Sequence, residues 1–313
     1  MQITPYKSKD INQGVFHMIT YAAAGDAMFP GGDLTPAGAE AVRKAKLRNM
    51  ELACTQLSID NEAKRLSLQI TRELLKEKVI NMKSVHLPFY GDKIWDPSTL
   101  DEDLRKDVSK RFSSLILDNL DLMAPEATIH ASHEPPLEEH PQHIDQVCKT
   151  IEEMIPALET ANMSLNVEFL PRNCVGRNVE ELELLTSRFD AKHVNINFDV
   201  NHIMNRYNEL PDMIRRLAPR IHAFHISDYD GIDELHWHPG QGIIDWCAVM
   251  KEIKAIDHDV LVILETTYQL GGRPPQHPAD PCFGLTQLAN DCYYLENCDS
   301  IVAAQNAFQI PGN

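Results

Sequence analysis

Short apolar runs that end in a metal-competent side chain recur along this chain. A histidine or a carboxylate ends, or nearly ends, the runs SVHLPF, ATIHAS, LNVEFL, VNINFDVNH, IHAFHISD and LVILETTY. Strands of a parallel sheet that is buried on both faces read as apolar runs of this kind. The carboxyl ends of such strands lie at one edge of the sheet, so we expect these polar side chains to converge there.

Helical patterns alternate with the apolar runs, and eight strand–helix units can be counted. We expect strands near residues 14–20, 50–57, 82–89, 127–132, 163–170, 193–199, 220–227 and 259–266, and helices near 35–48, 60–78, 101–122, 141–161, 178–189, 207–217, 243–256 and 284–296. Eight such units close most economically into an α/β fold of the (β/α)8 TIM barrel type; a doubly wound open sheet is the alternative.

The domain organisation is expected to be simple. No linker of different composition divides the chain, so we predict a single domain over residues 1–313, with the barrel at about 14–297 and short terminal extensions. The longest irregular segments, at 20–34, 88–100, 228–242 and 266–283, should all lie on one mouth of the barrel, where loops form substrate pockets.

Composition limits the classes of partner. The chain has 29 basic and 46 acidic residues, a formal net charge of −17, which argues against a protein that gains affinity from phosphates of a nucleic acid. The N-terminus has no apolar signal segment, and no stretch approaches the roughly 20 apolar residues of a membrane span. We expect a cytoplasmic protein with a small-molecule substrate and no membrane contact; a homo-oligomer is compatible with these features.

Glu168 and Glu265 are the strongest candidates for site residues. Each ends an apolar run, and a carboxylate at the end of a buried strand is costly unless it is paired or bound to metal. The alternative interpretation is an acid that caps a helix or pairs with an arginine such as Arg172 or Arg273.

Strand periodicity adds two further candidates. In the run VNINFD, Asp199 falls on the polar face, and in IHAFHI, His225 falls on the opposite face from His222. Three carboxylates and one histidine would form a hard site suited to Mn²⁺, Mg²⁺ or Co²⁺.

Further histidines follow the expected strands or lie in the mouth loops. His86, His130, His202 and His236 would soften the site toward Zn²⁺ and could hold more than one ion, whereas a buried histidine bonded to a carbonyl is the alternative for each. We interpret His140 and His143 as solvated. The motifs GxSxG, GxxxxGK[ST], HExxH and a strand-end GxGxxG are all missing from the sequence, which leaves metal chemistry as the leading hypothesis.

These residues resemble a known family. The order of strand-end side chains, the Asp199-x-x-His202 pair and the segment from His236 through Pro239-Gly240-Gln241-Gly242 to Asp245-Trp246 are similar to the xylose isomerase-like TIM barrel superfamily, which includes sugar phosphate isomerases and epimerases and AP endonuclease family 2. The resemblance runs from about the first strand to Glu265.

The ketose 3-epimerase branch of that family implies a specific chemistry. Its metal ligands match Glu168, Asp199, His225 and Glu265, and the two glutamates would also be the acid and base that form and quench a cis-enediolate of a keto-sugar or related polyol. Substrate contacts are expected from His86, His130, His202, His236 and Arg273. The arginine that this branch places soon after the His225 position is missing, since residues 227–233 contain none.

Three other activities are compatible with the same residues. Inosose dehydratase-like members imply a dehydratase or lyase acting on a keto-sugar or inosose. Endonuclease IV implies a metal-dependent phosphodiesterase with three zinc ions. Its zinc ligands match His86, His130, Glu168, Asp199, His202, His225, His236 and Glu265, and Glu234 stands where that enzyme has an aspartate. A non-catalytic metal- or sugar-binding protein would leave the paired glutamates unexplained.

Overall fold

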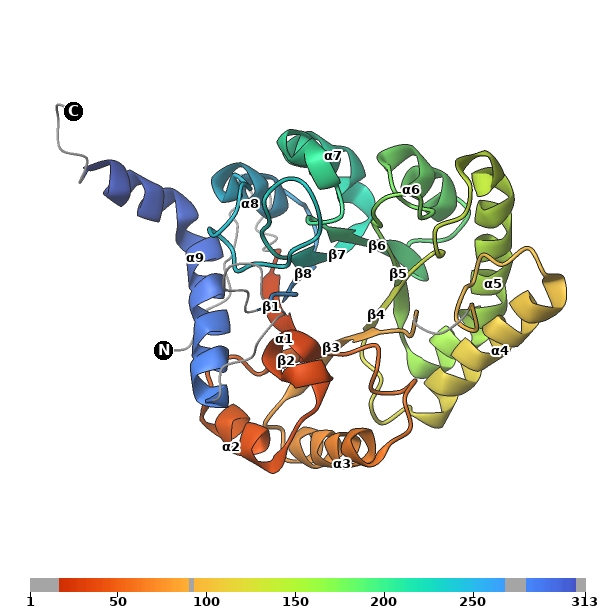
Figure 1. Cartoon of the computed structure of the whole chain (residues 1–313), viewed down its shortest axis with the longest axis horizontal. Helices are drawn as coiled ribbons and strands as arrows, with labels where there is room; N and C mark the ends of the chain where they lie inside the picture. The colour runs from red at the N-terminus through yellow and green to blue at the C-terminus, as the bar shows by residue number, and fades with distance from the viewer. Residues whose placement is uncertain (1–16, 90–92, 268–279, 308–313) are drawn as a thin grey trace.

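The computed structural model describes residues 17–89, 93–267 and 280–307 of the chain. Eight parallel strands close into a barrel in sequence order, with helices around the outside (Figure 1). The strands are β1 (Ile19–Ala24), β2 (Asn49–Leu52), β3 (Asn81–His86), β4 (Glu126–Ile129), β5 (Ser164–Glu168), β6 (Val194–Asp199), β7 (Ile221–Ile226) and β8 (Val260–Leu264). Because β1 pairs with β8 over five residues, the barrel has no open edge.

One or more helical segments follow each strand. The α-helices are α1 (Gly25–Met28), α2 (Pro36–Lys44), α3 (Glu62–Lys76), α4 (Glu102–Asp118), α5 (His140–Ala161), α6 (Val179–Thr186), α7 (Leu210–Leu217), α8 (Trp246–Lys254) and α9 (Pro281–Ala307). Short 3₁₀ segments are η1 (Pro30–Gly32), η2 (Leu137–Glu139), η3 (Met204–Glu209) and η4 (Ala218–Arg220). Helix α9 runs along the outside near α2 and α8, and its C-terminal end extends beyond the barrel (Figure 1).

Side-chain caps explain where several helices begin. Thr35, Asn61, Asp101, Asn178 and Asp245 each accept a hydrogen bond from a backbone N–H in the first turn of the helix that follows. Such caps satisfy N–H groups that have no partner within the helix. The caps fix the start of each helix just after a mouth loop, which in turn fixes the path of that loop.

The predicted (β/α)8 barrel is confirmed, and the open-sheet alternative is excluded by the β1–β8 pairing. The first strand was predicted too early: β1 spans Ile19–Ala24, and His17 precedes it. The apolar run ITYAAA is buried, whereas residues 14–16 lie outside the described part of the chain. The domain limits proposed from the sequence stay a prediction. None of the described helices is long and apolar enough to cross a membrane.

Candidate metal centre at the barrel mouth

Four consecutive strands bring the predicted inner residues together. Asp199 and His225 are direct neighbours in the β6–β7 register, and Glu168 ends β5. Glu265 follows β8, where its N–H donates to the Ile226 carbonyl at 3.0 Å. One ligand atom from each of these four side chains lies within 4.8 Å of those of the other three. We call these four residues the inner quartet.

His225 lies at the centre of a cluster of carboxylates. Its Nδ1 atom is 3.0 Å from Glu168 Oε1 and 3.2 Å from Glu265 Oε2. Its Nε2 atom is 3.0 Å from Oε1 of Glu51, an acid on β2. The imidazole has no exposed surface, so these contacts are made away from bulk water.

Asp199 has an oxygen atom whose hydrogen-bonding capacity is unused. Its Oδ1 accepts from the Asn201 N–H at 2.7 Å, but no hydrogen bond from a described residue reaches the buried Oδ2. The nearest imidazole nitrogen, His202 Nδ1, is 3.3 Å from Oδ2 but donates to the Phe169 carbonyl at 2.8 Å. A buried carboxylate oxygen without a donor is costly, and a bound cation would satisfy it. The quartet therefore fits a divalent ion.

The ionisation of the quartet is uneven. Burial alone would raise the pKa of Glu168, but His130 and His225 outweigh burial and hold that pKa well below its ordinary range. Burial is likewise outweighed at Glu265, mainly by His225, so its pKa is also lowered. Burial raises the pKa of Asp199 to about 6 despite the nearby His202. Both glutamates are thus ionised at neutral pH, and Asp199 is the member that most resists ionisation.

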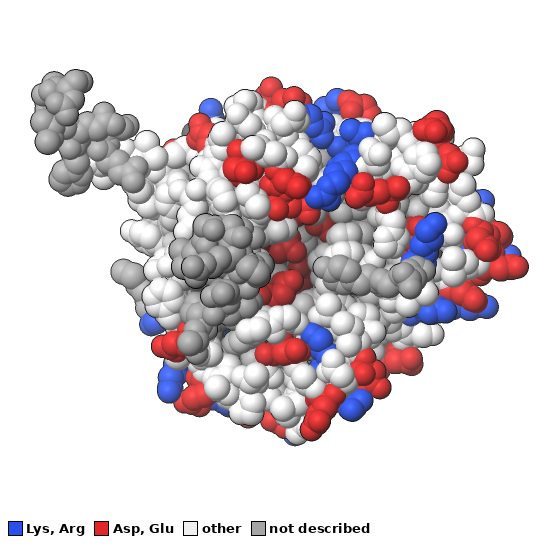
Figure 2. Space-filling model, in the orientation of Figure 1, with Lys and Arg blue, Asp and Glu red and all other residues white. Residues whose placement is uncertain are grey.

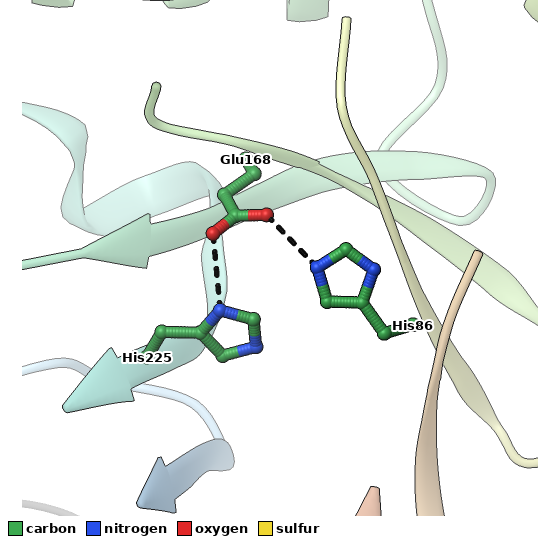
Figure 3. A group of neighbouring side chains, drawn as sticks. All are labelled: His86, Glu168 and His225. Carbon is green, nitrogen blue, oxygen red and sulfur yellow. Dashed lines mark hydrogen bonds and ion pairs between the residues drawn. The ribbon is translucent and has the colours of Figure 1, made fainter. Parts of the chain in front are cut away.

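Two further predicted histidines lie against Glu168. Its Oε2 atom is 2.9 Å from His130 Nε2 and 3.4 Å from His86 Nε2. Figure 3 shows Glu168 between His86 and His225, with its two oxygens directed to different rings. His130 also stacks on Phe89, with ring centroids 3.8 Å apart. Glu168 therefore pairs with histidines and not with Arg172, which excludes one alternative interpretation of this acid.

His202 and His236 form a second group with Glu234. The ligand atoms of the three side chains lie within 4.8 Å of one another. His202 and His236 donate through Nδ1 to the carbonyls of Phe169 (2.8 Å) and Glu265 (3.1 Å), which leaves each Nε2 available. Such carbonyl bonds orient histidines that bind metals. The structure thus places a second set of potential ligands beside the quartet.

A cavity of about 700 Å³ lies above these residues. Its lining includes four of the five residues predicted to contact substrate; the fifth, Arg273, lies outside the described residues. Figure 2 shows the hollow at the centre of this face, with acidic side chains inside it. Arg172 is the one lysine or arginine among the described lining residues, and it is already paired with Asp233 and Glu234, each at 2.8 Å.

The segment around Pro239-Gly240-Gln241-Gly242 is organised by Asp228. Its Oδ2 accepts from the Gly240 N–H and Trp246 Nε1, both at 2.9 Å. Asp228 and Trp237 also exchange two backbone hydrogen bonds, of 2.8 and 2.7 Å. A β-carbon on Gly242 would lie 2.1 Å from the Tyr229 carbonyl oxygen, so this position requires glycine. The sequence motif therefore builds the loop that carries Glu234 and His236.

The residue that sequence reasoning missed is Glu51. It is 1% exposed, in a strand of only four residues, at a shift in the β2–β3 register. A charged residue between two apolar residues of a barrel strand was the available signal. The interpretation of His140 and His143 as solvated was wrong: both are buried, His140 against Glu181 at 2.9 Å and His143 against the Ser98 carbonyl at 2.8 Å.

Comparisons with known proteins agree with this architecture. A curated relative, the uncharacterized protein MJ1311 of Methanocaldococcus jannaschii, is 24% identical over 187 residues, a match that spans 58% of this chain and 63% of that protein's length. Similar solved structures include a D-tagatose 3-epimerase-like protein (TM-score 0.69, 18% identity, 88% of this chain and 98% of the other) and 3-keto-D-glucoside 4-epimerase YcjR from E. coli (TM-score 0.64, 13% identity, 90% and 100%). At these identities the likeness shows a shared fold. The family model described as xylose isomerase-like TIM barrel matches residues 39–281, and the chain belongs to that family.

Proposed function

We propose that this protein is a divalent-metal-dependent isomerase or epimerase of a keto-sugar or related polyol. The observation that carries the proposal is the pair of glutamates, Glu168 and Glu265, which face the same nitrogen of His225 beneath a cavity of about 700 Å³. Two carboxylates at one point of a pocket suit proton removal and proton return at a single substrate carbon. Similar solved structures named as sugar epimerases also favour this reaction class.

The inner quartet would hold the ion. Three carboxylates and one imidazole suit Mn²⁺, Mg²⁺ or Co²⁺, and Zn²⁺ is compatible with the same donors. When bound, such an ion supplies Lewis-acid chemistry, because coordination of vicinal oxygens of a ketose acidifies the C–H bond between them.

The protein side chains would perform the proton transfers. Glu265 is 22% exposed and Glu168 only 1%, so Glu265 is the more accessible from the cavity and is assigned as the base. It takes the proton from the carbon next to the carbonyl, and the C–H electrons form the double bond of a cis-enediolate. Glu168 is ionised in the resting site, so it must receive a proton before it can return one to carbon. Burial would lower the pKa of His86, but Glu168 and Glu51 outweigh burial and raise that pKa to about 9; its Nε2, 3.4 Å from Glu168 Oε2, is positioned to supply the proton. Exchange with water then returns a proton to His86 and removes one from Glu265.

The rest of the pocket suits a neutral, hydroxyl-rich substrate. The imidazoles of His86, His130, His202 and His236 line the cavity and can hydrogen-bond sugar hydroxyls, and Arg273 stays a predicted substrate contact. Within the described lining, acids outnumber the single arginine, whose charge is already balanced by Asp233 and Glu234. An uncharged sugar avoids the repulsion that a phosphate would meet among these acids.

Deuterium exchange tests the proposal. The protein would be incubated with a panel of ketoses in D₂O with Mn²⁺, and with EDTA as a control; after removal of the metal, NMR would monitor the hydrogen next to the carbonyl. We expect metal-dependent exchange and formation of an epimer or isomer, both lost in Glu265→Gln. Water loss from the product would indicate the dehydratase instead. Failure of every ketose to exchange would refute the enolisation mechanism.

A phosphodiesterase is the second candidate, favoured by one specific observation. His202, Glu234 and His236 form a second potential ion site, and His86 with Glu168 and His225 forms a further group that shares ligands with the quartet. Several ions in one pocket are typical of phosphodiester hydrolysis by metal-activated hydroxide. Cleavage of an abasic-site duplex by the Zn²⁺-loaded protein, lost in Glu234→Gln, would promote this function over the sugar reaction.

A further inference from the structure

We infer that Glu51 is a positioning residue that holds His225 with Nδ1 free to bind the metal; the inference rests on the proposed metal-dependent function. Glu51 lies on β2, on the opposite side of the His225 ring from Glu168 and Glu265. Its Oε1 atom is 3.0 Å from His225 Nε2, and both side chains are at most 1% exposed. Glu51 does not share in the quartet, and it is not among the described residues that line the cavity.

The contact between Glu51 and His225 matters because it decides which nitrogen of the imidazole carries the proton. A neutral imidazole carries one proton, so only one of its two nitrogens can offer a lone pair to a metal. A carboxylate is an acceptor and therefore keeps the proton on the nitrogen that faces it. Carboxylates face both nitrogens of His225, but Glu168 and Glu265, at 3.0 and 3.2 Å from Nδ1, belong to the quartet and would turn to a bound ion. Glu51 lies outside the quartet, so it is the acceptor that would keep the hydrogen on Nε2 and leave Nδ1 to the metal.

His225 differs from the other histidines of the mouth in how it is oriented. His86, His202 and His236 each donate through Nδ1 to a backbone carbonyl, those of Leu87, Phe169 and Glu265. Their Nε2 atoms are the ones left available. His225 has the reverse arrangement, with Nδ1 toward the site, and its outer partner is a carboxylate instead of a carbonyl. Carboxylate partners orient metal-binding histidines and raise their basicity.

Glu51 is itself held in place from the neighbouring strands. Ser84 on β3 donates to Glu51 Oε2 at 2.5 Å, and Thr128 on β4 donates to the same oxygen at 3.4 Å. Thr128 in turn accepts from Asn197 on β6 at 3.2 Å. The β2–β3 register shifts between Met50 and Glu51, an irregularity of the kind that redirects a side chain. This network satisfies the second oxygen and leaves Oε1 for His225.

Glu126 offers a matched control. This acid also belongs to a barrel strand and is hydrogen-bonded by Ser164 Oγ (2.7 Å) and Asn166 Nδ2 (2.9 Å), but it lies at the start of β4. In the described part of the chain, no hydrogen bond or ion pair joins it to His225. A Glu126→Gln variant therefore removes a comparable barrel carboxylate without changing the support of the proposed metal ligand.

Metal affinity, measured independently of activity, tests the inference. Mn²⁺ titrations by calorimetry would compare the wild type with Glu51→Ala, Glu51→Gln and Glu126→Gln. Loss of an outer partner typically weakens metal binding about 10–100-fold, the result expected for Glu51→Ala. The glutamine of Glu51→Gln can still accept a hydrogen bond from Nε2–H of His225, so this variant should keep most of the wild-type metal affinity. The affinity of Glu126→Gln should stay within about twofold of the wild type, because Glu126 does not contact a proposed metal ligand.

A spectroscopic signature separates positioning from general stability. In the Co²⁺-loaded protein, the exchangeable Nε2–H of His225 should give a paramagnetically shifted proton signal that exchanges slowly with water in the wild type and is lost in Glu51→Ala. If Glu51→Ala does not fold, Glu51→Gln is measured instead, and its proton signal should persist but exchange faster with water. Unchanged affinity in both variants, or an equal loss in Glu126→Gln, would overturn the inference. A wild type that binds Mn²⁺ but exchanges no ketose would refute the proposed function alone.

Discussion

Asp228 and Asp199 have no exposed surface, yet their environments differ in one respect. The two oxygens of Asp228 accept four N–H donors, at 2.9 to 3.2 Å, from Tyr229, Gly240, Ile244 and Trp246. Asp199 accepts one, through Oδ1, and its Oδ2 receives no hydrogen bond from the described residues. The first carboxylate is satisfied by the protein, whereas the second is left for a ligand. This contrast separates a structural acid from a candidate metal ligand.

The largest expected effect is on chemistry at the mouth. Glu265→Gln should lower the rate of ketose proton exchange by about 10²–10⁴-fold, because the variant lacks the proposed base. Exchange rates measured by NMR at saturating Mn²⁺ would check this. Glu126→Gln, which changes an acid at the other end of the barrel, should keep the wild-type rate; a similar loss in both variants would contradict the assignment.

Removal of the structural acid should have the next largest effect. Asp228→Ala leaves several buried N–H groups without an acceptor, so we expect it to lower the free energy of unfolding by about 3–5 kcal/mol. Urea unfolding in EDTA would compare it with Asp199→Ala, which removes an oxygen that has no donor and should cost much less. Equal losses of stability in the two variants would contradict the proposed difference between Asp228 and Asp199.

The glycine beside Asp228 offers a smaller perturbation of the same loop. In Gly242→Ala the new β-carbon would lie 2.1 Å from the Tyr229 oxygen and 2.3 Å from Asp228 Oδ1. We expect a loss of about 1–3 kcal/mol in unfolding free energy, typical of overpacking. Gln241→Ala, at an exposed neighbouring position, is the control and should change stability by less than about 0.5 kcal/mol. A tolerated Gly242→Ala would show that the loop is not fixed by Asp228.

Ionisation of Asp199 should lower the stability of the metal-free protein as the pH rises. Burial raises its pKa to about 6 from an ordinary 3.8, so the stability that it contributes at low pH is lost as pH rises through about 4 to 6. In EDTA above pH 6, Asp199→Asn should therefore be more stable than the wild type by about 1–2 kcal/mol. Urea unfolding at pH 4 and pH 7.5 would measure it. A variant that is less stable at pH 7.5 without metal would contradict this account.

The sequence predicted the barrel and the convergence of the four inner-quartet side chains better than it predicted the residues that surround them. Alternation of apolar runs and helices identified all eight strands, and period two placed Asp199 and His225 on the faces that meet at the mouth. Strand β1 was misplaced because its run, ITYAAA, joins the preceding apolar residues without a break.

Glu51 stands out in the sequence as a charge between two apolar residues, but the sequence does not show which residues it contacts. Its strand has four residues, too few to establish a period, and its partners Ser84, Thr128 and His225 are distant in the chain. Likewise, the buried positions of His140 and His143 depend on contacts with Glu181 and Ser98 that no local pattern indicates. Short motifs identify the residues that end strands. The residues that orient those side chains come together only when the barrel closes, so no local pattern identifies them.

Anomalous scattering from crystals grown with Mn²⁺ would show whether the inner quartet binds an ion. We expect a dominant peak enclosed by Glu168, Asp199, His225 and Glu265, within bonding distance of Asp199 Oδ2, and loss of that peak in Asp199→Asn. The lack of a peak at the quartet would refute the proposed metal site. Three peaks of similar height, with one beside His202, Glu234 and His236, would favour the phosphodiesterase over the sugar isomerase.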